Sequence, residues 1–245
     1  MRDWIYGRNA VYEALLANRR QFFQVRLAQG VQEKGRLADI LEMAAARKLP
    51  IERLARQRLD TINTGSQGVA LECGPYPYVN LADLLDLANT RQEKPFLLIL
   101  DALQDPQNLG TLLRTAEAAG VHGILLPLKH TVTITPAVVN ASAGASEHLL
   151  VAQANLAQAI ASLKQAGLWV IGLEGGPDAQ TPHQLRLDGP LALVVGSEGQ
   201  GMRPLVRSSC DALLRLPMRG KVESLNAAVA GSIALYLARQ ARGFG

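Results

Sequence analysis

The sequence predicts an α/β protein in which a larger C-terminal domain with a mostly parallel sheet follows a small N-terminal α/β domain. Segments such as Phe96–Leu100 and Leu191–Val195 are apolar throughout, as strands of a sheet covered on both faces require. From residue 95 onward, strand-like and helix-like segments alternate. Between the two parts, Gly74-Pro-Tyr-Pro-Tyr78 cannot continue a central strand, because proline lacks an N–H and stiffens the chain.

The N-terminal segment reads as a compact α/β unit. Apolar periodicity predicts helices over 9–16 and 36–47 and strands over 23–28, 51–54 and 69–73. The proline-rich stretch marks its end. We therefore predict a first domain over 1–75, a linker over 76–94 with a helical stretch at 81–87, and a second domain over 95–245.

In the second domain the same patterns predict strands over 96–101, 123–126, 148–152, 168–173, 191–195 and 212–216. Helices are predicted over 109–119, 136–141, 156–166, near Pro204 and from Ser224 to the end. The last helix is rich in small residues, which let another element pack very close.

Composition excludes several classes of protein. The chain has 245 residues, of which 48% are hydrophobic and 19% charged, so it is not disordered. No apolar run reaches the roughly 18 residues of a membrane span, and the start Met-Arg-Asp-Trp is not a secretory leader, so we expect a cytoplasmic protein. Cys73 and Cys210 lie far apart and the four histidines are scattered, so neither a disulfide framework nor a metal site is expected.

Charge is biased toward the N-terminus. The chain carries a net +4, and residues 1–75 contain 12 Lys or Arg against 8 Asp or Glu. The basic residues that fall near ends of predicted elements are Arg8, Arg19, Arg20, Arg47, Lys48, Arg53, Arg56 and Arg58. They are equally compatible with phosphate contacts and with an ordinary solvated surface.

Three predicted strand ends carry unusual residues, and ligands of parallel sheets bind at such ends. After the first strand, Asn108 could cap a helix, and Arg114 follows within that helix. Arg114 could be an ordinary solvated charge or a ligand of a phosphate. The turn Val195-Gly-Ser-Glu-Gly-Gln-Gly-Met202 permits close backbone approach to a ligand. It does not match the dinucleotide fingerprint.

The third strand end leads through a polar loop to Ser224. A serine at a helix start normally caps free backbone N–H groups, although such a joint also presents donors to a ligand. No Walker A lysine motif, G-x-S-x-G elbow or HExxH is present.

Three segments together resemble the motifs of the SpoU (TrmH) family of RNA ribose 2′-O-methyltransferases. They are Asp105-Pro-Gln-Asn-Leu-Gly-Thr-Leu-Leu-Arg-Thr-Ala116, Val195 to Met202, and Leu216-Pro-Met-Arg-Gly-Lys-Val-Glu-Ser-Leu-Asn226 with the Ala-Ala-Val-Ala that follows. The segments at 5–15 and 65–70 resemble the substrate-binding domain of the subgroup that modifies a guanosine in 23S rRNA. That domain is similar to ribosomal protein L30e.

The resemblance implies a SPOUT domain with a deep trefoil knot, a homodimer, an RNA substrate and S-adenosylmethionine as methyl donor, without a metal. It places the donor against Leu173, Glu174, Gly175, Gly196, Leu216, Met218, Ser224 and Leu225. It assigns the remaining site roles to Asn108, Arg114, Glu198, Ser224 and Asn226. Arg114 would reach the site from the partner subunit and assist loss of the ribose hydroxyl proton.

Two points remain open in the sequence. An arginine stays protonated at ordinary pH, so Arg114 fits a phosphate anchor as well as a base. Ser66 stands where related enzymes often have His. Besides a 23S rRNA enzyme, a tRNA 2′-O-methyltransferase and a non-catalytic RNA-binding or assembly factor are alternatives.

Overall fold

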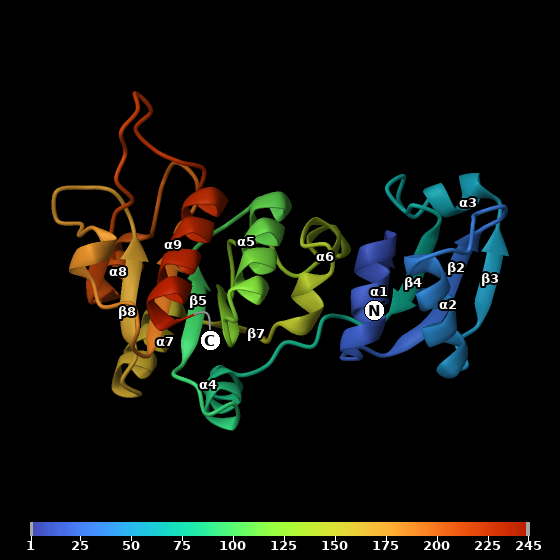
Figure 1. Ribbon diagram of the computed structural model, residues 1–245, viewed down its shortest axis with the longest axis horizontal. Helices are drawn as coiled ribbons and strands as arrows, with labels where there is room; N and C mark the ends of the chain where they lie inside the picture. The colour runs from blue at the N-terminus through green and yellow to red at the C-terminus, as the bar shows by residue number, and fades with distance from the viewer. Residues whose placement is uncertain (1, 244–245) are drawn as a thin grey trace. The chain divides into compact units, whose positions relative to one another are not determined.

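The computed structural model describes residues 2–243 of the chain (Figure 1). They form two compact units, one of residues 2–77 with 134–148 and one of 78–133 with 149–243. The sequence did not suggest that residues 134–148 pack with the N-terminal segment. The division into domains at 75 and 95 stays a prediction.

The helices and strands of the first unit include two elements that the sequence patterns missed, β1 and α3. In order they are β1 Asp3–Tyr6, α1 Arg8–Ala17, β2 Phe22–Ala28, α2 Arg36–Ala46, β3 Ile51–Leu54, α3 Arg56–Asp60, β4 Val69–Cys73, α6 Pro136–Ala141 and the 3-10 turn η1 Ala145–His148. The sheet has the order β1-β4-β2-β3. Both β1 and β2 run antiparallel to β4, whereas β2 and β3 are parallel.

The first unit is held together by a buried ion pair between Arg20 and Glu147. Arg20 donates from Nε to Oε2 and from Nη2 to Oε1, both at 2.7 Å, and also to the carbonyl of Gly74. Burial lowers the pKa of Arg20, but the hydrogen bond and charge of Glu147 outweigh it and leave the pKa raised. Both interpretations left open for Arg20, a phosphate contact and a solvated surface charge, are therefore wrong, because its guanidinium is buried and paired with Glu147.

Ser66, the departure from the family pattern, has a structural role in a turn. It is fully buried, and its hydroxyl accepts a hydrogen bond from the N–H of Gly68 at 3.4 Å and donates to Asp60. Arg53, Arg56 and Arg58 remain exposed. For these three cations, a phosphate contact and a solvated surface charge both stay predictions.

The second unit carries the predicted parallel sheet. Its elements are α4 Leu81–Thr90, β5 Phe96–Leu100, α5 Pro106–Ala118, β6 Gly123–Pro127, β7 Val151–Ala154, α7 Leu156–Gln165, β8 Trp169–Leu173, the 3-10 turn η2 Pro182–Gln184, β9 Leu191–Val195, α8 Pro204–Ser209, β10 Ala212–Leu214 and α9 Ala227–Arg242. The order is β10-β8-β9-β5-β6-β7, and every neighbouring pair is parallel. The α/β fold class is confirmed; the trefoil knot stays a prediction.

Some predicted boundaries were wrong. The strand expected over 148–152 is β7 at Val151–Ala154, because His148 ends the preceding 3-10 turn. The strand expected to reach Leu216 ends at Leu214. In both cases an apolar residue outside the strand was predicted to belong to it. Leu149 is buried ahead of β7, and Leu216 lines a cavity after β10.

Helices α5 and α9 pack closely on one another beside the sheet. A Cβ at Gly231 would lie 2.6 Å from Cδ2 of Leu112 and 3.1 Å from a methyl of Val195. Close packing by the small residues of the last helix is confirmed here. The hydroxyls of Thr115 and Ser232 also meet, at 2.9 Å.

The two cysteines are free, and burial raises the pKa of both thiols to about 12. Such thiols are poor nucleophiles at neutral pH. Within residues 2–243, no helix is long and apolar enough to cross a membrane, and no group of three His, Cys, Asp or Glu side chains is placed to hold a metal ion.

Candidate active site

The helix starts at the site differ from the predicted ones. Helix α9 begins at Ala227 and its N-cap is Asn226, whose side-chain oxygen accepts from the N–H groups of Ala228 and Val229 at 2.9 and 3.2 Å. Ser224 therefore does not open the helix. Asn226, two residues later, is as good an N-cap as Ser224. The sequence alone therefore does not tell which of the two begins the helix.

Helix α5 begins earlier than its apolar pattern suggested. Asp105 is the N-cap and accepts from the N–H of Gln107 at 3.0 Å, with Pro106 at the first helical position. Asn108 lies in the first turn, so the reading of Asn108 as the cap is wrong. Its side chain is free to face the glycine-rich turn.

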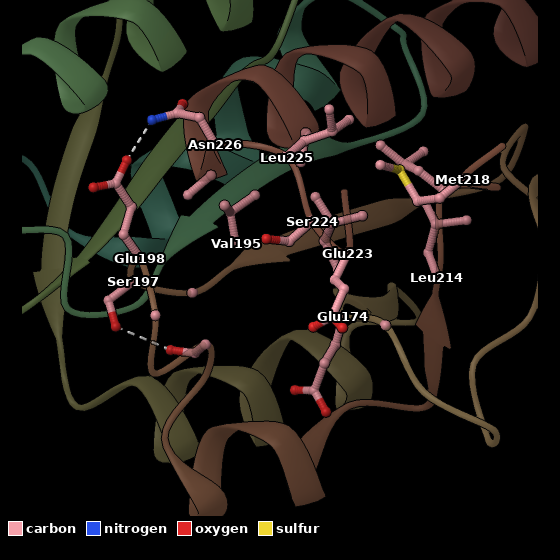
Figure 2. Close-up of a pocket in the computed structure, with 18 residues that line it drawn as sticks. Glu174, Val195, Ser197, Glu198, Leu214, Met218, Glu223, Ser224, Leu225 and Asn226 are labelled. Carbon is pink, nitrogen blue, oxygen red and sulfur yellow. Dashed lines mark hydrogen bonds between the residues drawn. The ribbon is translucent and has the colours of Figure 1, made fainter. Parts of the chain in front are cut away.

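Glu198 joins the starts of these two helices. Its Oε1 accepts from Nδ2 of Asn108 at 2.7 Å and from Nδ2 of Asn226. The Asn226 amide also reaches Oδ1 of Asn108, at 3.2 Å. A carboxylate near two helix N-termini is electrostatically favourable. Three of the five predicted site residues thus form one network. Figure 2 shows two of them, Glu198 and Asn226, at one end of the cavity.

The glycine-rich turn is tight enough to require Gly196. A Cβ there would lie 2.2 Å from the carbonyl carbon of Gly201 and 2.3 Å from the nitrogen of Met202. Ser197 and Gly201 exchange two backbone hydrogen bonds of 3.0 Å, and Gly199 and Gly201 have positive φ. The turn presents its outer backbone to the cavity.

An ion pair fixes the far side of this turn to β5. Asp101, fully buried at the end of β5, accepts from the backbone N–H of Arg203 at 2.8 Å and from its Nε at 2.7 Å. The N–H of Asp101 in turn donates to the carbonyl of Val195 at 2.8 Å. The last residue of β9 and the residue after the turn are thus both bonded to Asp101, the first by its backbone N–H and the second by its side chain.

A cavity of about 540 Å³ opens at the carboxyl ends of β8, β9 and β10. Figure 2 shows Glu198 and Asn226 at one end of it and Met218 and Leu214 at the other. All eight residues predicted to hold the donor line it: Leu173, Glu174, Gly175, Gly196, Leu216, Met218, Ser224 and Leu225. Their assignment to a donor stays a prediction, but the structure brings them together.

The cavity suits a molecule such as S-adenosylmethionine. Its volume lies in the usual range for small-molecule sites, and apolar side chains and glycines form much of its wall. Three carboxylates line it, those of Glu174, Glu198 and Glu223, whereas no described lining residue is Lys or Arg. A sulfonium cation is complementary to this charge. Glu174 is held by Arg207, whose Nε donates to it at 2.6 Å.

Arg114 is not part of this wall. It lies on α5, it is exposed, and among residues 2–243 it makes no hydrogen bond or ion pair with another side chain. One subunit alone therefore brings together Asn108, Glu198, Ser224 and Asn226 near the cavity without Arg114. That Arg114 serves a different subunit's site stays a prediction.

The prediction missed several lining residues. Val195, Leu214, Ser197, Gly199, Gly201, Glu223, Ala227 and Ala230 also line the cavity. Val195 and Leu214 are the last residues of their strands, so their position at strand ends was the signal available. Glu223 directly precedes Ser224, and only its charge distinguished it.

Comparison with known proteins gives two family matches. Residues 95–236 match the SpoU rRNA Methylase family, and residues 4–79 match the RNA 2'-O ribose methyltransferase substrate binding family. Among named proteins, a TrmH family tRNA/rRNA methyltransferase of Bacillus subtilis, YacO, is 43% identical over 239 residues, covering 96% of this chain and 94% of its own. A TrmH family tRNA/rRNA methyltransferase of Staphylococcus haemolyticus is 39% identical, covering 95% and 93%.

Solved structures agree. The AdoMet-bound rRNA methyltransferase from Sinorhizobium meliloti is 26% identical with a TM-score of 0.80, covering 98% of this chain and 87% of its own. The SpoU methyltransferase AviRb from Streptomyces viridochromogenes, also with AdoMet, shares the fold at a TM-score of 0.79 and 20% identity, covering 98% and 90%. With its methylase segment, substrate-binding segment and donor-sized cavity, the chain belongs to the SpoU family of RNA methyltransferases and uses S-adenosylmethionine.

Proposed function

We propose that the enzyme methylates the ribose 2′-hydroxyl of a guanosine in 23S rRNA. The observation that carries this is the match of residues 4–79 to a substrate-binding domain of RNA 2'-O ribose methyltransferases. The S. meliloti rRNA methyltransferase aligns over 98% of the chain. By contrast, a tRNA-modifying TrmH/SpoU enzyme of A. aeolicus covers 64% of it. The N-terminal segment therefore favours rRNA.

Methylation of a tRNA is the second candidate, because the relatives from B. subtilis and S. haemolyticus are named for tRNA and rRNA together. Both candidates use the same donor cavity. They differ in what the exposed cations of the first unit, such as Arg53, Arg56 and Arg58, bind.

The donor supplies a methyl group already activated by the positive sulfonium. The residues of the chain therefore need to align the acceptor hydroxyl and accept or pass on its proton. The network of Glu198, Asn108 and Asn226 fixes the end of the cavity where both helices start. Ser224, exposed beside it, presents a hydroxyl that can donate to or accept from a ribose oxygen.

We infer that Arg114 acts across a homodimer. Val229, Ile233 and Tyr236 are 46, 40 and 47% exposed, and their spacing puts them on one face of α9. An apolar stripe on a helix of a globular protein marks an interface. Because α9 packs against α5, a partner on this stripe lies beside Arg114. Its guanidinium then either anchors an RNA phosphate or assists deprotonation.

The experiment is transfer of labelled methyl groups from S-adenosylmethionine to unmodified 23S rRNA and to bulk tRNA in parallel, followed by nucleotide-resolution mapping of 2′-O-methylation. One labelled guanosine ribose in 23S rRNA is expected. Label only in tRNA would shift the proposal to the second candidate, and label on a base in place of a ribose would contradict both. The Asn226→Ala variant serves as the site-impaired control.

A further inference from the structure

A second cavity, also of about 540 Å³, lies at the amino ends of the parallel strands, opposite the ends that form the donor cavity. It opens where β8 and β9 begin, whereas the donor cavity lies where these strands end. No residue lines both cavities. The reaction described above makes no use of this second cavity.

An exposed tryptophan forms part of its wall. Trp169 is 39% exposed, although it is the first residue of β8 and the next residues of that strand are buried. Its backbone N–H donates to the carbonyl of Pro190 at 3.0 Å, which fixes the residue at the rim. Within residues 2–243 the indole N–H has no hydrogen-bond partner. An exposed indole ring can serve as a stacking platform for a planar group.

Three cations, Lys94, Lys164 and Arg186, line the same cavity as Trp169. Lys164 pairs with Asp211 at 2.7 Å and Arg186 with Asp188 at 3.0 Å, with 39 and 76% of the two cationic side chains exposed. Ion pairs this exposed contribute little, so a phosphate can replace the carboxylate as the partner of either cation. Within residues 2–243, Lys94 donates only to a backbone carbonyl, that of Asp188, at 3.2 Å.

The rim is also held in place from α9. The guanidinium of Arg242, the last residue of that helix, donates to the carbonyls of both Lys94 and Gly189. Asp211 is fixed by accepting from the N–H of Val170 at 2.9 Å. Hydrogen bonds therefore tie this rim to neighbouring elements, and its three cations are exposed side chains.

We propose that this cavity binds one unpaired nucleotide of the RNA substrate, with its base stacked on Trp169 and its phosphates near Lys94, Lys164 and Arg186. A stacking ring flanked by cations is how single-stranded nucleic acid is held without sequence preference. The inference rests on the RNA substrate of the family and not on which RNA is methylated. It gives the second unit an RNA contact distant from the reacting ribose.

Tryptophan fluorescence tests it directly. The chain has two tryptophans, so Trp4→Phe leaves Trp169 as the only one. Titration of this full-length variant with an unstructured oligoadenylate should quench the emission saturably, and added salt should weaken the effect. Adenosine monophosphate should quench only at much higher concentration. Unchanged emission while the same oligonucleotide binds the protein would overturn the proposal, and equal quenching by the mononucleotide would indicate a nucleotide site instead.

Substitutions supply a second test in the wild-type background. Trp169→Ala should raise the Kd for the oligonucleotide by about 5- to 100-fold, while Trp169→Phe keeps most of the affinity and neither changes the affinity for S-adenosylmethionine. Lys164→Ala should weaken RNA binding and reduce its salt dependence. Arg91→Ala, which removes an exposed cation outside the cavity, is the control. An equal loss in the control, or none in Trp169→Ala, would contradict the proposal. Oligonucleotide binding is measured without methyl transfer, so failure of the proposed 23S rRNA target leaves this test intact.

Discussion

Asn226 donates a hydrogen bond to Glu198 with the amide nitrogen of the same side chain whose oxygen caps α9. The position of Glu198 is therefore coupled to the start of the helix that forms one wall of the donor cavity. Asn108 ties the same carboxylate to the start of α5. Two helices and the glycine-rich turn thus share one polar junction.

Glu198→Ala should lower kcat/KM for methyl transfer by about 10- to 100-fold, because the two asparagines lose their common acceptor and the alignment of the site is lost. Glu198→Gln keeps one oxygen acceptor and should retain a larger share of the activity. Steady-state assays over a range of RNA concentrations, with S-adenosylmethionine saturating, measure kcat/KM for both variants. Equal activity of Glu198→Ala and wild type would show that the junction has no part in the reaction.

Gly196→Ala should abolish binding of S-adenosylmethionine and destabilise the protein by about 2 kcal/mol or more, since the added methyl overlaps the backbone of Gly201 and Met202. Calorimetric binding and denaturant unfolding report the two effects. Gly220→Ala is the matched control, because a Cβ at Gly220 meets nothing within 4 Å. Normal donor binding by Gly196→Ala would contradict the expectation that the tight turn requires glycine at this position.

Much of this arrangement could be predicted from sequence, for physical reasons. Uniformly apolar segments identified the buried strands, and three motifs located the cavity. The caps could not be assigned, because Asn108, Asp105, Ser224 and Asn226 are all good capping residues and only the tertiary network decides among them. Arg20 was misread because its partner Glu147 is 127 residues away, and local sequence carries no sign of such a pairing.

Stability should fall in mild acid because of His122. This side chain is 1% exposed; its Nδ1 accepts from the N–H of Phe96 at 3.0 Å and its Nε2 faces Glu93 at 2.9 Å. Burial lowers the pKa of His122 below the ordinary 6.5, although Glu93 opposes the shift. The folded state thus favours neutral His122. Its contribution to stability is present above pH 6.5 and is lost as the pH falls through that value toward the folded pKa.

The free energy of unfolding of the wild type and of His122→Asn, measured by denaturant titration at intervals of about one pH unit between pH 5 and pH 8, tests this expectation. The asparagine offers an acceptor for Phe96 but does not titrate, so its stability should depend less on pH over this range. If both proteins lose stability in parallel on acidification, His122 is not the responsible group.

Mixed dimers can determine whether Arg114 acts on the partner's site. Arg114→Ala and Asn226→Ala should each be nearly inactive alone. When equal amounts of the two variants are mixed and exchange subunits, half of the dimers are heterodimers. Each heterodimer contains one site that combines an intact donor cavity with an intact Arg114 from the other subunit. Activity should therefore return to about one quarter of wild type. If Arg114 served its own subunit, every site in the mixture would lack one of the two residues and no activity would return. Ile233→Asp, which places a charge in the apolar stripe on α9, should prevent both dimer formation in light scattering and this recovery, because a charge buried without a partner opposes association.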